Sequence, residues 1–231
     1  MPVLLMSRGD TQAKDLLRRV IEARYGYQPP VIETLRITMR GRIPTKIGPL
    51  SLNAQMEITA YFRFSSTVRF DITVRFLGIP LQRINVGYDG TTVYRKQGDT
   101  VTILEGESSP YRSFLWAAAG FFLTPLGEHF VELSSTGEHS FDAKNIQNGD
   151  VASLQLHPDN RLDKVQVSSP SAANDQQQIF TLGLNRDRVL INDLAFPTQV
   201  TASWKGITYT LAPVSAEVNP PLQDALFTLQ Q

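Results

Sequence analysis

The side chains that could do chemistry are few and scattered. The sequence has three histidines, and two of them directly follow a glutamate, in Glu128-His129 and Glu138-His139; the third is His157. No HExxH motif is present, and no set of Asp, Glu and His residues has the spacing of a metal site. We therefore expect neither a metal ion nor a cofactor.

The sequence also has no motif that indicates nucleophilic or acid–base catalysis. The absence of cysteine excludes disulfides, thiolate ligands and cysteine nucleophiles, and no GxSxG elbow or glycine-rich phosphate loop is present. Carboxylates such as Glu57 and Asp71 are typical of a solvated strand face and not of an acid–base pair. The Arg8-Gly9-Asp10 triplet resembles an integrin ligand, but Asp10 is well placed to cap a helix. We predict that the protein is not an enzyme.

The composition is that of a globular chain. Of the 231 residues, 42% are apolar and 19% are charged, with 22 basic and 22 acidic side chains. This balance gives no general attraction to nucleic acid, so we expect no nucleic-acid partner. No apolar run approaches the ~20 residues that span a bilayer as a helix. Residues 1–6 lack the basic and apolar regions of an export signal, and we expect that such a signal has been removed.

Two helices are predicted to pack against the rest of the chain. Residues 10–25 have a 3.6-residue hydrophobic period, with a capping aspartate before them and Gly26, Pro29 and Pro30 after them. The predicted buried stripe of this amphipathic helix is Ala13, Leu16, Leu17, Val20 and Ile21. Residues 110–123 (PYRSFLWAAAGFFL) are rich in alanine and large apolar groups, which predicts a helix that is apolar on nearly all sides.

Elsewhere the hydrophobic period is two, which is typical of half-buried strands. Val68, Phe70, Ile72, Val74 and Phe76 alternate with polar residues, and a similar run begins at residue 50. Recurrent turn signals between such runs predict ten or eleven strands, within 32–104 and 130–212. Residues 218–231 are predicted to form a docking tail. We expect 1–231 to be a single domain.

Two helices are too few to cover a flat sheet of this size. An antiparallel sheet with one apolar face must bury that face, so we predict that it curls on itself. The expected fold is mainly β (α+β), with a strongly curved antiparallel sheet around the helices. Its concave face is either a packed core or a cavity large enough for lipid, and the sequence leaves both open.

Several motifs then occur in the order found in one known family. A helix ending near Tyr25 precedes two long strands, a strand that holds Arg69, the hairpin 77–81 (LGIPL) and the turn 86–94 (VGYDGTTVY). A helical insertion follows, and residues 196–200 (FPTQV) and 219–222 (NPPL) come near the end. In this order the chain resembles the LolA/LolB-like superfamily of lipoprotein carriers. Because of its Gly-Ile-Pro-Leu hairpin, the chain resembles LolB-like lipoproteins more than it resembles LolA.

The resemblance implies an unclosed β-barrel that is lidded by helices. It also implies that lipid or lipoprotein acyl chains bind in an apolar cavity and are transferred in the periplasm or at the outer membrane. The lipid-modified cysteine of such lipoproteins is missing, so anchoring stays open. The alternatives are a packed β-domain that acts as an envelope protein–protein interaction module, and a hydrolase or isomerase on a barrel scaffold. We favour a monomer.

The resemblance and the strand pattern together indicate four sets of site residues. The cavity is expected to be lined by Met39, Leu52, Met56, Ile58, Phe70, Ile72 and Val74. The lid, or alternatively an ordinary core helix, would contain Phe114, Leu115, Trp116, Phe121, Phe122 and Leu123. A hydrophobic loop that touches the membrane, or else folds back onto the sheet, would contain Leu77, Ile79 and Leu81. Arg69 matches an arginine implicated in lid control, although its place on the polar strand face favours pairing with Asp71 or Glu57.

Overall fold

A computed structural model describes residues 6–47, 50–64, 66–106, 108–169, 178–192, 194–204 and 207–228.

The first helix is fixed at both ends. Helix α1 (Thr11–Tyr25) starts where the Asp10 carboxylate accepts a hydrogen bond from the Ala13 N–H at 2.7 Å. It ends at Gly26, whose φ of 72° favours glycine. Its buried residues are those of the predicted stripe, which confirms the amphipathic helix: Ala13, Leu16, Leu17, Val20 and Ile21.

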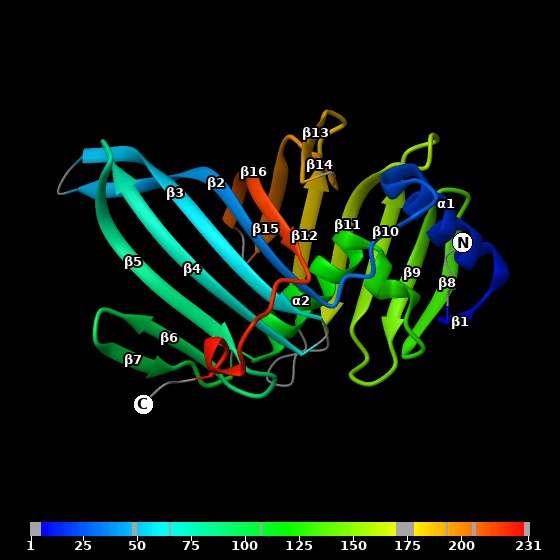
Figure 1. The fold of residues 1–231 in the computed structure, drawn as a ribbon, viewed down its shortest axis with the longest axis horizontal. Helices are drawn as coiled ribbons and strands as arrows, with labels where there is room; N and C mark the ends of the chain where they lie inside the picture. The colour runs from blue at the N-terminus through cyan, green and yellow to red at the C-terminus, as the bar shows by residue number, and fades with distance from the viewer. Residues whose placement is uncertain are drawn as a thin grey trace.

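The remaining chain is built mainly of strands, nearly all antiparallel to their neighbours (Figure 1). One large sheet holds, in spatial order, β1 (Arg8–Gly9), β8 (Val131–Gly137), β9 (Ser140–Asn145), β10 (Val151–Leu156), β11 (Leu162–Ser169), β12 (Gln178–Leu184), β15 (Val200–Trp204), β16 (Ile207–Val218), β2 (Thr34–Ile47), β3 (Leu50–Arg63), β4 (Thr67–Phe76), β5 (Ile79–Tyr88), β6 (Val93–Gln97) and β7 (Thr100–Ile103). A separate hairpin is formed by β13 (Arg188–Ile191) and β14 (Leu194–Pro197).

The predicted curved and unclosed sheet is confirmed, but it has more strands than the sequence indicated. Among the described residues the large sheet has 14 strands, against the ten or eleven expected. Strands such as β6 and β7 contain only five and four residues, which is too short for a clear alternation. The two outermost strands, β1 and β7, each pair on one side only within the described chain, so the sheet does not close.

The sheet bends around the second helix. Helix α2 (Ser108–Phe122) crosses the hollow between the long strands β2–β5 and the strands β10–β12 (Figure 1). Register shifts between Val74 and Arg75 and between Pro213 and Ser215 mark irregularities of the kind that bend strands. Neither α1 nor α2 has the length and apolar character needed to cross a bilayer, and the described residues contain no other candidate.

Helix α2 is anchored on one side of the hollow. It packs mainly on β10, β11 and β12 and touches β4 and β5 at fewer points. The indole N–H of Trp116 donates to the Ala143 carbonyl at 3.0 Å, and Arg112 forms a bidentate ion pair with the fully buried Asp150. A Cβ at Gly120 would lie 2.8 Å from Val165, so glycine allows the helix to approach β11 this closely.

The end of α2 is clamped by the end of α1. The Arg24 guanidinium donates to the Phe121 carbonyl, and the Tyr25 hydroxyl donates to the Phe122 carbonyl at 2.9 Å. These two carbonyls are among those that an α-helix leaves unpaired at its C-terminus. The β13–β14 hairpin adds Phe196, which is fully buried against Phe121 and Phe122. A 3₁₀ turn, η1 (Thr124–Gly127), follows α2.

Candidate functional site

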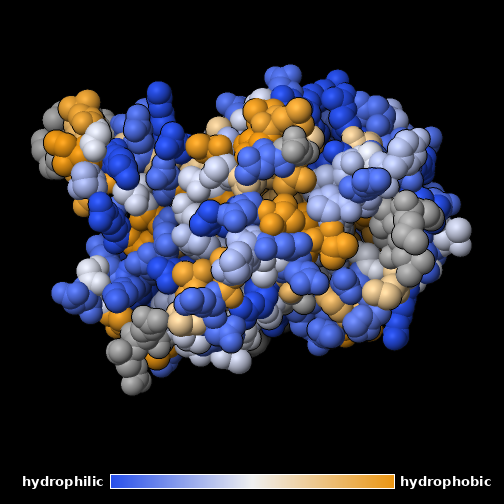
Figure 2. Space-filling model, viewed as in Figure 1, coloured by the Kyte–Doolittle hydropathy of each residue, from blue (hydrophilic) through white to orange (hydrophobic). Residues whose placement is uncertain are grey.

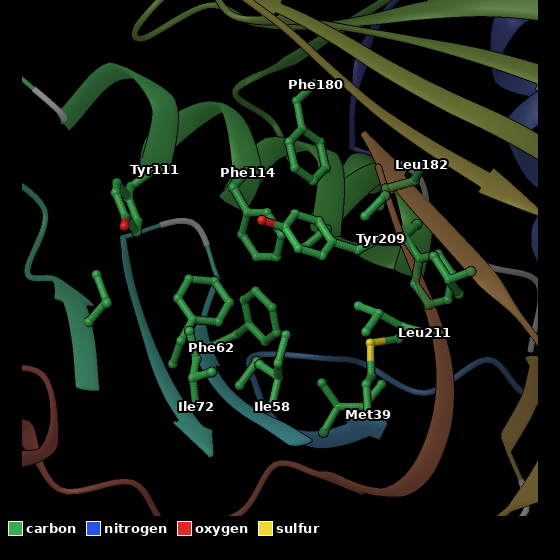
Figure 3. Close-up of a pocket in the computed structure, with 18 of the residues that line it drawn as sticks. Met39, Ile58, Phe62, Ile72, Tyr111, Phe114, Phe180, Leu182, Tyr209 and Leu211 are labelled. Carbon is green, nitrogen blue, oxygen red and sulfur yellow. The ribbon is translucent and has the colours of Figure 1, made fainter. Parts of the chain in front are cut away.

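A pocket of about 250 Å³ lies between α2 and the concave face of the sheet (Figure 3). Its walls come from α2, from β2–β5 and from β12, β15 and β16. All lining side chains are hydrocarbon or thioether groups apart from the hydroxyls of two tyrosines: Ile37, Met39, Met56, Ile58, Ala60, Phe62, Phe70, Ile72, Val86, Pro110, Tyr111, Phe114, Ala118, Phe121, Phe122, Phe180, Leu182, Val200, Ala202, Tyr209 and Leu211. A pocket with such walls favours a hydrocarbon ligand.

The aromatic ring of Phe114 projects from α2 and forms part of the pocket wall (Figure 3). Its centroid is 5.9 Å from that of Phe62 in β3, 4.8 Å from that of Phe70 in β4 and 5.1 Å from that of Phe180 in β12. Phe114 therefore joins two parts of the sheet across the hollow through ring contacts. These contacts hold the pocket at its present size.

The structure brings most of the predicted lining residues together. Five of the seven line the pocket, namely Met39, Met56, Ile58, Phe70 and Ile72. Val74 is buried but does not line it. The side chain of Leu52 lies outside the part of the chain that the structure describes.

The predicted lid residues divide into two groups. Phe114, Phe121 and Phe122 face the pocket. Leu115, Trp116 and Leu123 are buried and do not line it. The helix thus has one side toward the pocket and one side in the hydrophobic core, and its role as a lid stays a prediction.

Sequence reasoning missed the walls that the C-terminal strands supply. Phe180 and Leu182 come from β12, and Tyr209 and Leu211 come from β16. Each pair has the i, i+2 spacing of residues on one strand face, so the signal was present. Their position in the pocket depends on β16 pairing with β2, a contact between distant parts of the chain that no local pattern reveals.

The hairpin between β4 and β5 exposes its apolar side chains. Leu77 is 85% exposed, Ile79 67% and Leu81 46%, so this hairpin does not fold back onto the sheet. Figure 2 shows hydrophobic residues gathered at the end of the molecule where β4 and β5 meet. Exposed apolar groups at a hairpin apex are costly in water and tolerable against lipid.

Arg69 lies on the sheet face that points away from the pocket. Its Nε donates to Asp71 at 2.8 Å, which is one of the two predicted pairings, and its Nη1 donates to the Leu226 carbonyl at 3.0 Å. Leu226 belongs to the C-terminal segment, which contains the 3₁₀ turn η2 (Asp224–Leu226). In the described contacts, Arg69 therefore holds the tail and does not touch α2.

The tail covers part of this outer face. Arg63 donates to the Leu222 carbonyl, pairs with Asp224 at 2.8 Å and lies over the ring of the buried Phe227. A second hollow of about 480 Å³ runs beside the tail, with charged and amide groups in its walls. Because these walls are mixed, the smaller apolar pocket is the better hydrocarbon site.

The pocket has few polar side-chain groups. The pocket offers only the hydroxyls of Tyr111 and Tyr209 as polar groups. No group of three or more acidic or histidine side chains within the described ranges is placed to hold a metal ion.

The fold is that of the LolA superfamily. A LolA superfamily protein from Nitrosomonas europaea matches with a TM-score of 0.52, over 95% of this chain and 99% of that one, at 11% identity. Such a likeness confirms the predicted LolA/LolB-like fold, and at this identity it establishes the fold alone. No family model matches the sequence, and no curated protein matches it either.

Two further solved structures have lower scores. A DUF1329 family protein from Desulfovibrio piger matches with a TM-score of 0.47 and 12% identity, over 94% of this chain and 95% of that one. An outer membrane lipoprotein-sorting protein domain from Vibrio parahaemolyticus matches with a TM-score of 0.45 and 10% identity, over 94% of both chains.

Proposed function

We propose that this protein binds acyl chains of a lipid or lipoprotein in the pocket beneath α2 and carries them within the cell envelope, without catalysing a reaction. The observation that carries this proposal is the apolar lining of the pocket, from Met39 on one side to Phe180 on the other. Each methylene that leaves water for such a site gains about 0.8 kcal/mol. The binding is non-directional, so release requires only an equally apolar acceptor.

The size of the pocket indicates that it must open to take a whole chain. Pockets that enclose drug-sized ligands measure about 300–1,000 Å³, whereas this one measures about 250 Å³. Phe114 bridges its walls by ring contacts, while Trp116 fastens α2 to β9 and Arg112 fastens it to Asp150, directly before β10. We infer that opening separates β2–β5 from the aromatic side of α2 and leaves the helix attached to β10–β12.

The exposed hairpin suits the transfer step. Leu77 and Ile79 extend from the strands β4 and β5, which also form one wall of the pocket through Phe70 and Val86. Insertion of these side chains into a membrane surface would bring that wall close to the lipid. The LolA-superfamily fold supports a periplasmic or outer-membrane location for this activity.

A binding assay with a matched pair of variants tests the proposal. Ile58 lines the pocket, and its neighbour Thr59 lies on the other face, where its hydroxyl contacts that of Thr38. The delipidated protein is titrated with a fluorescent fatty acid. We expect saturable binding that Ile58→Asn weakens at least tenfold, because a buried amide without a partner is costly, and that Thr59→Asn leaves unchanged. The proposal fails if the unmodified protein shows no saturable binding.

One observation favours a second candidate function, that of a protein–protein interaction module. Strand β7 lies at an edge of the sheet, and its residues are exposed, among them Val101 at 41% and Ile103 at 55%. An unpaired strand edge can accept a strand from another chain. Val101→Pro would then abolish partner capture and leave fatty-acid binding intact.

A further inference from the structure

A small cavity outside the acyl pocket is surrounded by positive charge. It measures about 80 Å³ and lies between the C-terminal half of α1, the start of β11 and the β13–β14 hairpin. Three of its lining residues are arginines, Arg24, Arg161 and Arg188. The other walls are apolar and come from Val20, Ala23, Leu162, Leu184, Ala195 and Pro197.

Arg24 is half-buried overall, but two nitrogens of its guanidinium are buried and have no partner within the described chain. Its Nη1 donates to the Phe121 carbonyl, and its guanidinium lies 4.5 Å from the centroid of the Phe121 ring. Its Nε and Nη2 are buried and have no hydrogen-bond partner among the described atoms, and no carboxylate within the described ranges forms an ion pair with it. Buried charges are normally paired, and no described carboxylate pairs with the charge of Arg24.

The other two arginines add to this excess charge. Arg188 donates from Nη1 to the Asn185 carbonyl. Burial lowers the pKa of the Arg188 guanidinium, and the positive charges of Arg24 and Arg161 lower it further. Arg161 is the only one of the three that forms an ion pair with a carboxylate in the described chain, since its Nε donates to Asp159 at 2.8 Å. Asp159 thus pairs with Arg161 and partly offsets the charge of Arg188, and no described carboxylate pairs with Arg24.

We propose that this cavity binds a phosphate-type oxyanion, either free phosphate or the phosphate of a lipid headgroup. Guanidinium groups present paired N–H donors that match the oxygens of phosphate. A water molecule requires about 10–15 Å³ of such volume, so 80 Å³ gives room for several waters or one small anion. The Phe121 and Phe122 rings line the acyl pocket and contact Arg24, so an anion here would sit beside the end of that pocket.

This proposal goes beyond acyl-chain binding, and its first test needs no lipid. The melting temperature of the delipidated protein is measured against inorganic phosphate at constant ionic strength, with chloride as the replacement anion. A specific site gives a saturable rise. Arg188→Gln, and separately Arg161→Gln on the exposed rim, should weaken the apparent affinity at least tenfold. Arg42→Gln, which removes the same charge from an exposed position in β2, should leave it unchanged.

The second test distinguishes a headgroup from free phosphate. Phosphatidic acid and a diacylglycerol with the same acyl chains differ only in the phosphate. If free phosphate has no effect, but phosphatidic acid binds at least tenfold more tightly than diacylglycerol and Arg188→Gln removes that preference, the ligand is a headgroup. The affinity of the Arg188→Gln variant for diacylglycerol is the control, because it measures binding in the acyl pocket without a phosphate. The proposal is overturned if the affinity for phosphate and the affinity for phosphatidic acid are both unchanged by Arg188→Gln and Arg161→Gln. It is also overturned if Arg42→Gln weakens the affinity as much as these two variants do.

Discussion

At the scale of single residues, the side chains that face the pocket differ in role from their immediate neighbours. Phe114 touches Phe62, Phe70 and Phe180 across the hollow, whereas the next residue, Leu115, is buried away from the pocket. This alternation within one helix provides matched variants that separate pocket size from general stability.

Phe114→Ala should enlarge the pocket and shift its preference toward longer chains. Removal of the ring leaves space that a few extra methylenes can occupy, at a cost of about 3 kcal/mol in the free energy of unfolding of the empty protein. The measurement is the ratio of dissociation constants for fatty acids of increasing length. Leu115→Ala is the control, since it should lower stability without changing that ratio. An unchanged ratio in Phe114→Ala would show that its ring does not limit the pocket.

The Arg112–Asp150 ion pair should matter mainly for stability. Asp150 is fully buried, so Arg112→Ala leaves a carboxylate without its bidentate partner. We expect a loss of about 3 kcal/mol in the free energy of unfolding, measured by urea denaturation. The double variant Arg112→Ala/Asp150→Ala should recover part of this loss. A double variant that is as unstable as the sum of the single variants would contradict the pairing.

At the scale of elements, helix α2 and the β4–β5 hairpin are the parts that bear on transfer. The helix is held by Trp116 and Arg112 on one side and by Arg24 and Tyr25 at its end. Among the described contacts none of this kind holds the apex of the hairpin, where Leu77 is largely exposed. The apex of the hairpin is therefore free to contact a membrane surface. The helix, in contrast, is held too firmly to detach from the sheet as a whole.

The double variant Leu77→Asn/Ile79→Asn should reduce binding to lipid vesicles and preserve the fold. Both side chains are exposed, so their loss removes little native packing, and the melting temperature should change little. Vesicle co-sedimentation measures the association, and fatty-acid binding in solution serves as the control. If the variant still transfers fatty acid between vesicles at the original rate, the hairpin is not the membrane contact.

Sequence patterns predicted the elements better than their arrangement. The period of α1 located its buried stripe, and the alternation of β3 and β4 located residues such as Ile58 and Phe70 on one face. No pattern indicated that β16 lies beside β2, so the walls from Phe180 to Leu211 were missed. The buried contacts of Arg24 were also invisible, because they join α1, α2 and the β13–β14 hairpin only in three dimensions.

At the scale of the whole molecule, one continuous hydrophobic core joins both helices to nearly the whole sheet. It includes Leu16 of α1, Leu115 of α2, Phe62 of β3 and Phe141 of β9. No separate core marks a boundary within the described chain. A protein with such a core should behave as one cooperative unit.

Unfolding of the delipidated protein should accordingly show a single transition. Trp116 is buried between α2 and β9, so its fluorescence reports on that region, while far-ultraviolet circular dichroism reports on the entire sheet. Trp204→Phe leaves Trp116 as the only indole, since the sequence has two tryptophans. The two signals should change at the same urea concentration. Separate midpoints would show that β2–β7 unfolds independently of β8–β12.

Within the described chain the outer strands β1 and β7 each pair on one side only, and this has a consequence for what the molecule can hold. In a closed barrel, strand number and stagger fix the diameter, so the interior has one size. A sheet whose edge strands do not pair with each other is free of this constraint. The distance between its edges can therefore change with the size of the ligand inside. We therefore expect such a sheet to widen around ligands of different thickness with no change in the number of strands.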